Sequence, residues 1–591
     1  MARPQHDGPP LMGGSGSEIR DGMQIDWDAA IPMDDGVVLR ADVFRPAGNA
    51  KYPVILNYGP YAKGHAFQDS RKFAWERMIK QKPEVAAGTS NKYQNWEVVD
   101  PGKWVPDGYA VVRVDSRGTG RSPGFVDPWS PRETKDLYDC IEWAASQAWC
   151  SGKVGLNGIS YFAMNAWQVA ALNPPHLAAV CAWEGAADHY RETCYHGGIY
   201  SEFISNWYPR AIVPIQHGVG ERGPRSRVTG EPVAGPETLA PEELAKNRRD
   251  IIADALKHPM DDAYHRARTP DLEKITVPFL SAANWGGQGI HPRGNFEAFM
   301  RSPSKQKWLE AHGDTHWLEF YTDYGVGLQK RFFGHFLKGE DTGWSKQPAV
   351  QLLVRHPGEK FVERHEHEWP LARTQWTKFY LEPDGHGLVH EPGKASTTRD
   401  FDALGDGLTF RMAPLKTPME ITGPAAAKLF VASSTVDADL FVILRVLAPD
   451  GSEVTFQGAQ DPHTPVAQGW LRASHRKLDR KRSLPYRPFH THDVVEPLTP
   501  GEPVELDIEI WPTCIVVPAG YTVALTIRGR DYEYGGAPVI APHVPYPLRG
   551  VGPFIHNEPR DRPPEIFGGR QTLHFAEGRR PWLMLPVIPA R

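Results

Sequence analysis

Lys153-Val154-Gly155-Leu156-Asn157-Gly158-Ile159-Ser160-Tyr161 is the stretch that decides the fold of this chain. Its first half is typical of a short buried strand, and the run 163–172 that follows has a helical pattern. Ser160 lies where the strand ends and the helix begins, so its hydroxyl is expected on a sharp turn at the carboxyl edge of a sheet. The stretch therefore predicts a nucleophilic serine at Ser160, although Phe162 replaces the second glycine of the G-x-S-x-G pattern.

Strands and helices alternate on both sides of this stretch. Buried strands are predicted at 52–58, 109–115, 177–182 and 275–282, and helices at 133–146 and 328–337. This alternation is typical of a parallel, doubly wound sheet. The polar, proline-interrupted segment 189–268 breaks the alternation and is predicted to form a helical cap over the carboxyl edge of the sheet.

The second half of the chain has a different pattern. Runs such as 427–431, 440–446, 504–510 and 521–527 predict strands with turns between them, and helix signals are almost absent. We expect an all-β jelly-roll sandwich there. The predicted organisation is a flexible tail over 1–22, a first α/β core segment over 23–188, the helical cap over 189–268, a second α/β core segment over 269–345 and the jelly-roll β-sandwich over 346–591.

Composition limits the partners and the compartment. Lys and Arg total 66 against 71 Asp and Glu, a net charge of -5 that predicts neither a nucleic-acid partner nor an anionic membrane. No apolar run is long enough for a signal peptide or a membrane span. The five cysteines form no CxxC pair, so we expect no disulfide framework, no zinc site and a cytoplasmic location. A homo-oligomer stays open.

Several separated motifs resemble one family. They are Gly158-Ile159-Ser160-Tyr161 after Trp149-Cys150-Ser151-Gly152, the loop Asp115-Ser116-Arg117-Gly118-Thr119-Gly120-Arg121-Ser122, Pro60-Tyr61, Asp188-His189-Tyr190-Arg191, and Glu420-Ile421-Thr422-Gly423-Pro424. In this order they resemble the CocE/NonD hydrolases, which include cocaine-esterase-like, X-prolyl dipeptidyl-peptidase-like and α-amino-acid ester hydrolase-like enzymes. The resemblance covers about residues 25–589 and implies an α/β-hydrolase domain followed by the jelly roll. Ala163 departs from it, because the family often has Gly there.

The resemblance also implies roles for residues. Ser160 would be the acyl-accepting nucleophile, and the Tyr61 hydroxyl and the Tyr161 backbone N–H would bind the oxyanion. The base would be a histidine late in the α/β domain, in the loop Glu310-Ala311-His312-Gly313-Asp314-Thr315-His316. His316 fits the position best, with His312 and His291 as the other candidates.

The acid of the triad is missing from its usual place. The family has Asp shortly after the Trp that ends the penultimate strand, and Gly287 occupies that position here. A triad needs a carboxylate to orient the imidazole and stabilise its positive charge. Glu184, at the end of an earlier apolar strand, is the predicted acid, with Asp188 and Asp314 as alternatives. The competing interpretation is that Glu184 pairs with an arginine and a carbonyl holds the histidine.

These features predict a serine hydrolase that cleaves a small-molecule carboxylic ester or amide through an acyl-enzyme, with no cofactor and no metal. The first alternative is an X-prolyl dipeptidyl-peptidase or another aminopeptidase or amidase. The second is a catalytically inactive binding protein with a decayed triad. The segment Glu363-Arg364-His365-Glu366-His367-Glu368 is interpreted as a charged surface loop rather than a metal site.

Overall fold

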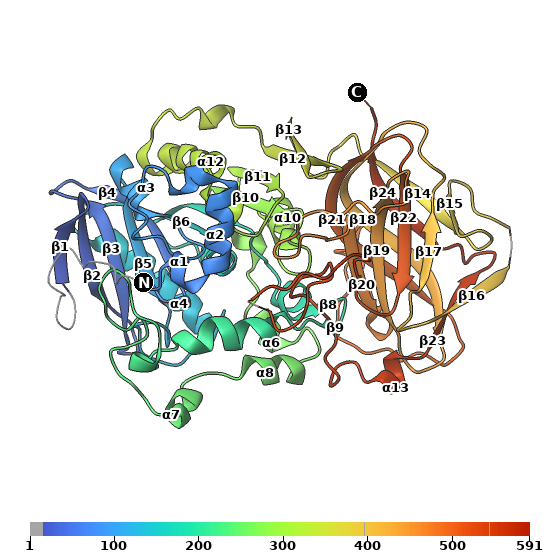
Figure 1. Ribbon diagram of the computed structural model, residues 1–591, viewed down its shortest axis with the longest axis horizontal. Coiled ribbons are helices and arrows are strands. Elements are labelled where there is room, and N and C mark those ends of the chain that lie inside the picture. The colour runs from blue at the N-terminus through green and yellow to red at the C-terminus, as the bar shows by residue number, and fades with distance from the viewer. Residues whose placement is uncertain (1–15, 395, 543, 591) are drawn as a thin grey trace.

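The computed structural model describes residues 16–394, 396–542 and 544–590, and it separates an α/β unit from a β-sandwich (Figure 1). Each unit is built on a sheet that has 11 strands among the described residues. The fold class predicted from the sequence is therefore confirmed, with the α/β unit formed by the first half of the chain and the sandwich by the second.

The first sheet has the strand order β1-β2-β3-β5-β4-β6-β7-β10-β11-β12-β13. The strands from β5 to β12 run parallel, and antiparallel strands flank them on both sides. The bounds are β1 (Gly16–Arg20), β2 (Met23–Pro32), β3 (Val38–Pro46), β4 (Tyr52–Gly59), β5 (Ala110–Asp115), β6 (Cys150–Ile159), β7 (Leu177–Trp183), β10 (Phe279–Asn284), β11 (Lys307–His312), β12 (Val350–His356) and β13 (Lys360–Glu366).

The helices of this unit pack on the sheet or form the cap. Helix α4 begins at Pro131 with the Ser130 hydroxyl accepting the Glu133 N–H, and it buries Leu137, Ile141 and Ala144 against the sheet. No helix among the described residues is long and apolar enough to span a membrane. The bounds are α1 (Phe67–Ser70), α2 (Lys72–Gln81), α3 (Pro101–Trp104), α4 (Pro131–Ser146), α5 (Tyr161–Ala170), α6 (Phe203–Trp207), α7 (Pro241–Lys246), α8 (Ile251–Lys257), α9 (Ala263–Arg266), α10 (Pro292–Arg301), α11 (Leu318–Tyr321) and α12 (Asp323–Phe333).

Two boundaries differ from those predicted. The predicted tail 1–22 includes β1, whose Glu18 accepts a hydrogen bond from the Trp27 indole at 2.8 Å; residues 1–15 lie outside the described residues. The predicted start of the sandwich at 346 is too early, because β12 pairs with β11 and β13 closes the edge of the first sheet. The charged segment 363–368 therefore begins in an edge strand, where charge discourages pairing with other chains.

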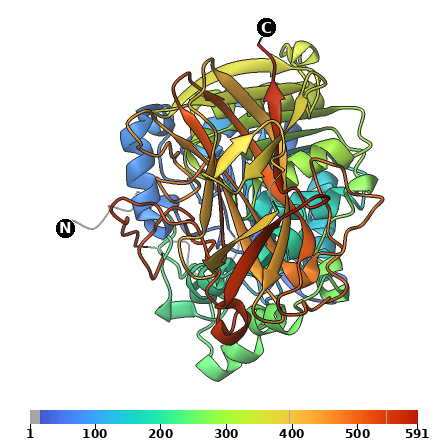
Figure 2. The same ribbon diagram turned by 90° about the vertical axis from the view of Figure 1, so that its right-hand side faces the viewer.

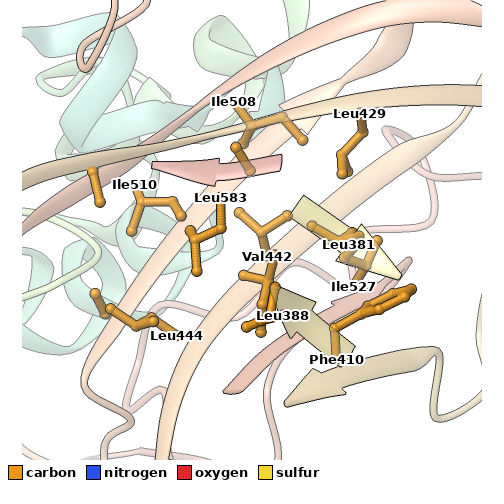
Figure 3. Close-up of a cluster of buried hydrophobic side chains, with 14 of the residues drawn as sticks. Leu381, Leu388, Phe410, Leu429, Val442, Leu444, Ile508, Ile510, Ile527 and Leu583 are labelled. Carbon is orange, nitrogen blue, oxygen red and sulfur yellow. The ribbon is translucent and has the colours of Figure 1, made fainter. Parts of the chain in front are cut away.

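The second sheet forms the sandwich, in the order β16-β23-β18-β21-β20-β19-β22-β17-β15-β14-β24, and β18 also pairs with β24. Leu429, Val442, Ile508, Ile527 and Leu583 converge in its core (Figure 3). The bounds are β14 (Gln375–Glu382), β15 (Gly387–Val389), β16 (Thr397–Asp402), β17 (Leu408–Arg411), β18 (Met419–Ser433), β19 (Asp439–Leu447), β20 (Ala467–Arg472), β21 (Val504–Val517), β22 (Thr522–Arg528), α13 (Pro564–Phe567), β23 (Arg570–Phe575) and β24 (Trp582–Ile588).

The two units meet beside the cap, and the turned view places the sandwich in front of the α/β unit (Figure 2). A short hairpin of β8 (Tyr195–His196) and β9 (Ile199–Tyr200) lies against β20, and the Arg472 N–H donates to the Gly197 carbonyl at 2.8 Å. A second contact comes from a sandwich loop, in which the Ala459 carbonyl accepts the His316 N–H at 3.0 Å. The sandwich therefore reaches the carboxyl edge of the first sheet.

Candidate active site

Ser160 lies on the turn between β6 and α5, near the centre of the first sheet. Its φ of 57° is in the left-handed region, which is uncommon for a residue other than glycine. Gly158 permits this turn, because a Cβ at that position would lie 2.5 Å from the Phe162 Cβ and 3.1 Å from the Glu97 carbonyl oxygen. The local sequence therefore fixes Ser160 in a strained, buried position at the N-terminus of a helix.

His291 is the histidine that contacts Ser160. It precedes α10, and its Nε2 lies 3.2 Å from the Ser160 Oγ. Among the described residues, its buried Nδ1 has no hydrogen-bond partner. A buried N–H without an acceptor is rarer than a buried acceptor without a donor, so the favoured neutral form carries its proton on Nε2. In that form His291 donates a hydrogen bond to the serine oxygen.

His316 lies beside His291 and is held by two carboxylates. Its Nδ1 is 2.8 Å from the Glu184 Oε2, and its Nε2 is 2.6 Å from the Glu97 Oε1. The two imidazole rings are stacked, with centroids 5.1 Å apart. The structure thus brings Glu184 to His316, as the sequence predicted, whereas the nitrogen of His316 that would face the serine is bound to Glu97.

The two histidines differ in their protonation state. Burial would lower the pKa of His316, but Glu184 and Glu97 outweigh it and raise the pKa to about 10. Burial, together with the charge on His316, lowers the pKa of His291 to about 3. Burial would raise the pKa of Glu184, yet His316 and His312 lower it to about 2. At neutral pH the resting site therefore holds a His316 cation and a neutral His291.

The other acids considered from the sequence lie elsewhere. Asp188 accepts the Arg191 N–H at 2.8 Å and pairs with the Arg191 guanidinium. The Asp314 carboxylate accepts the N–H of Thr315 at 2.6 Å. Neither carboxylate has a hydrogen bond to a histidine among the contacts of the described residues.

The two expected oxyanion donors are near Ser160. Tyr61 follows β4, is half-buried and accepts a hydrogen bond from the Trp207 indole at 3.2 Å on its Oη. Its ring packs edge-on against Tyr161, with centroids 6.2 Å apart. Tyr161 begins α5, where backbone N–H groups lack intrahelical acceptors, and its hydroxyl binds Glu133. The Tyr161 hydroxyl is thus held by Glu133, and its backbone N–H lies at the start of the helix.

Aromatic side chains form a cluster around Tyr161, the residue that follows Ser160. Trp129 stacks on Tyr161 at 5.0 Å and on Trp207 at 5.1 Å, and Phe203 stacks on Trp207 at 5.9 Å. Phe554, from the sandwich unit, packs on Phe203 at 5.7 Å. Residues of the α/β core, the cap and the sandwich therefore share one apolar cluster.

Three buried residues of the cap segment could ligate a metal ion: His189 and Cys194 of the turn η3 (His189–Cys194), and His265 of α9. Their ligand atoms lie within 4.8 Å of one another. The His265 Nε2 lies 2.8 Å from the His258 carbonyl and must donate to it, which leaves Nδ1 to accept from the His189 Nδ1–H at 2.9 Å. The cluster can thus satisfy its own hydrogen bonds without an ion.

Comparisons with known proteins show the family of this chain. Residues 35–317 match the family model "X-Pro dipeptidyl-peptidase (S15 family)", and residues 342–560 match "X-Pro dipeptidyl-peptidase C-terminal non-catalytic domain". The crystal structure of a CocE/NonD family hydrolase from Staphylococcus aureus is 30% identical, covers 98% of this chain and 97% of its own, and superposes with a TM-score of 0.82. This chain belongs to the CocE/NonD hydrolase family.

Curated members of the family are more distant in sequence. Cocaine esterase of a Rhodococcus species is 27% identical over 72% of this chain and 80% of its own length. A putative serine esterase of Mycobacterium bovis is 24% identical over 85% of this chain and 90% of its own length. The expected membership is confirmed, and the protein is a serine hydrolase of the CocE/NonD family.

Glu97 is the residue of this CocE/NonD site that the sequence did not indicate. It has a φ of 67°, and its carbonyl accepts the Ile159 N–H at 3.0 Å, so its segment lies against the end of the nucleophile strand. The available signal was a single carboxylate inside the otherwise apolar run Trp96-Glu97-Val98-Val99. A charge that the fold buries in such a run needs a partner, and His316 supplies it.

Proposed function

We propose that this enzyme hydrolyses a carboxylic ester through an acyl-enzyme on Ser160, with His316 as general base and Glu184 as the orienting acid. The observation that carries the proposal is the 2.8 Å contact between the His316 Nδ1 and Glu184, since a carboxylate on Nδ1 is what a base histidine needs. The Nδ1 of His291 has no carboxylate partner within the described part of the chain. A second imidazolium at that position would also face the neighbouring His316 cation.

The steps follow from these roles. The His316 cation first loses its Nε2 proton to bulk water, which frees Nε2 from Glu97. The free Nε2 then takes the Ser160 proton as Oγ bonds to the ester carbonyl carbon. The Tyr61 hydroxyl and the Tyr161 N–H bind the oxyanion, while the His291 N–H stays near Oγ. His316 gives the proton to the departing alkoxide. A water molecule, deprotonated by His316, then releases the acid and restores Ser160.

A fluorophosphonate probe tests the nucleophile directly. We expect the probe to label the wild-type enzyme once, with the adduct located on Ser160 by peptide mass spectrometry, and to abolish turnover of p-nitrophenyl esters in proportion to labelling. Labelling at another serine would contradict the assignment. An unlabelled, inactive wild type would instead favour the binding-protein alternative.

Glu97→Gln is expected to shift the pH profile toward acid. Only neutral His316 can accept a proton, so kcat/KM of the wild type should rise as the pH approaches the raised pKa of His316, about 10. Removing one neighbouring negative charge lowers that pKa, and the acidic limb should move down by about one pH unit or more. The profile is measured with a p-nitrophenyl ester. Glu142→Gln, which breaks the exposed Glu142–His176 pair, is the matched control and should leave the limb in place.

If the acidic limb of the Glu97→Gln profile moves up or stays in place, Glu97 does not raise the pKa of His316 in the way proposed.

Glu97 also supports the second candidate function, cleavage of an amide next to a free amine. Its Oε2 is buried without a hydrogen-bond partner among the described residues, and a carboxylate is the group that an ammonium would bind. Comparing an X-prolyl p-nitroanilide with p-nitrophenyl esters separates the two substrate classes.

A further inference from the structure

A second imidazole lies behind the proposed triad. The His312 Nε2 is 3.2 Å from the Glu184 Oε1, and its Nδ1 is 2.7 Å from the Glu310 Oε2. Both His312 and Glu310 belong to β11, and the remaining Glu310 oxygen accepts the Tyr324 hydroxyl at 3.0 Å. Glu184 therefore has one imidazole on each carboxylate oxygen. The hydrogen-bonded row runs from His316 through Glu184, His312 and Glu310 to Tyr324 on α12.

Hydrogen-bond geometry sets the charge of His312. A neutral imidazole has one N–H, yet carboxylate oxygens face both nitrogens of His312, and a carboxylate only accepts. Both contacts are hydrogen bonds when His312 is an imidazolium. Burial would lower the pKa of His312, but Glu310 and Glu184 outweigh it and raise the pKa to about 10, in agreement with the geometry.

The row is buried, so its charges act on one another strongly. His312 is fully buried, and its ring lies against Trp183, with centroids 5.0 Å apart. Among the described residues, the other titratable groups that face this row from the packed elements include Glu97, Arg71, His291, Glu319, Tyr324, Tyr61, Tyr321 and Cys181. Two imidazoliums between Glu97, Glu184 and Glu310 leave one excess negative charge, whereas the row without the His312 charge would carry two.

We propose that His312, clamped by Glu310, is a positioning residue that holds Glu184 ionised and limits the basicity of His316. The proposal rests on the proposed function, in which His316 is the base and Glu184 its acid. The Asn284 amide also donates to the Glu184 Oε1 at 3.2 Å, so His312 and Asn284 together fix the oxygen that His316 leaves free. In this family member the relocated acid thus has its own cationic partner.

His312→Gln tests the proposal, because a glutamine amide can still donate to Glu184 but carries no charge. Loss of that cation raises the pKa of His316, so the acidic limb of kcat/KM should move up by about one pH unit or more. Activity at pH 7 should fall about tenfold or more and recover at alkaline pH. His176→Gln, at the exposed Glu142–His176 pair, is the matched control and should leave the profile unchanged.

A merely structural role predicts a different result, since an altered fold would lower kcat at every pH and leave the limb in place. That outcome, or a limb that moves down, overturns the inference. If His312→Gln does not fold, Glu310→Gln replaces it. Without Glu310 the pKa of His312 falls, so less of its positive charge remains at neutral pH and a smaller upward shift of the limb is expected. A wild type that neither labels on Ser160 nor depends on His316 would refute the proposed function instead.

Discussion

Ser160→Ala is expected to reduce kcat for p-nitrophenyl esters by about 10⁵-fold or more while leaving the protein folded. The hydroxyl forms the bond to the acyl group, and the strained turn at φ 57° holds it where no neighbouring side chain can substitute. Alanine at a left-handed φ costs little more than serine, so the thermal midpoint of unfolding should change by only a few degrees.

Two measurements accompany this variant. Steady-state turnover gives kcat, and the fluorophosphonate adduct should be absent. Ser146→Ala, on the exposed end of α4, is the matched control and should retain full activity. The Ser146 hydroxyl donates to the Trp143 carbonyl and accepts from the Gln147 amide. Appreciable turnover by Ser160→Ala, after exclusion of contaminating esterases, would place the nucleophile elsewhere.

His316→Gln is expected to lower kcat by about 10⁴-fold or more, and His291→Gln by about 10²-fold. Glutamine is the appropriate replacement because its amide can still contact Glu184 and Glu97, so neither buried carboxylate loses every partner. His316 is assigned proton transfer in both half-reactions. His291 is assigned one hydrogen bond to the Ser160 Oγ, which explains the smaller loss.

A comparison of the His316→Gln and His291→Gln variants decides which imidazole is the base. Both variants must first match the wild type in thermal unfolding and in circular dichroism. The measurements are then kcat and the rate of fluorophosphonate labelling. If His291→Gln shows the larger loss, the 3.2 Å contact between His291 and Ser160 is the catalytic one, and His316 acts only as a buried cation.

The turn of Ser160 could be predicted because its signals are local. The apolar strand, Gly158 and the following helix place Ser160 on that turn, since a few consecutive residues determine the backbone there. The roles of Tyr61 and His316 came instead from the resemblance to the CocE/NonD hydrolases, which pointed to the turn after β4 and to the loop after β11.

The predictions for the boundary at 346 and for the segment 363–368 failed because both depended on how strands pair. The predicted boundary at 346 followed a change in composition, yet β12 adds to the α/β sheet by hydrogen bonds to β11. An exposed, charged edge strand such as β13 has the same local sequence as a polar loop, so only its partner strand distinguishes the two.

The sequence by itself determined the two-unit architecture and predicted Ser160 as the nucleophile, because apolar periodicity and turn chemistry act over a few residues. Only the tertiary structure decided the partners of His316. Glu184 and Glu97 are 132 and 219 residues away in the chain, and they meet the histidine because β7 and β11 end at the same edge of the sheet beside the segment around Glu97. Strand order sets those neighbours, and no local pattern records it.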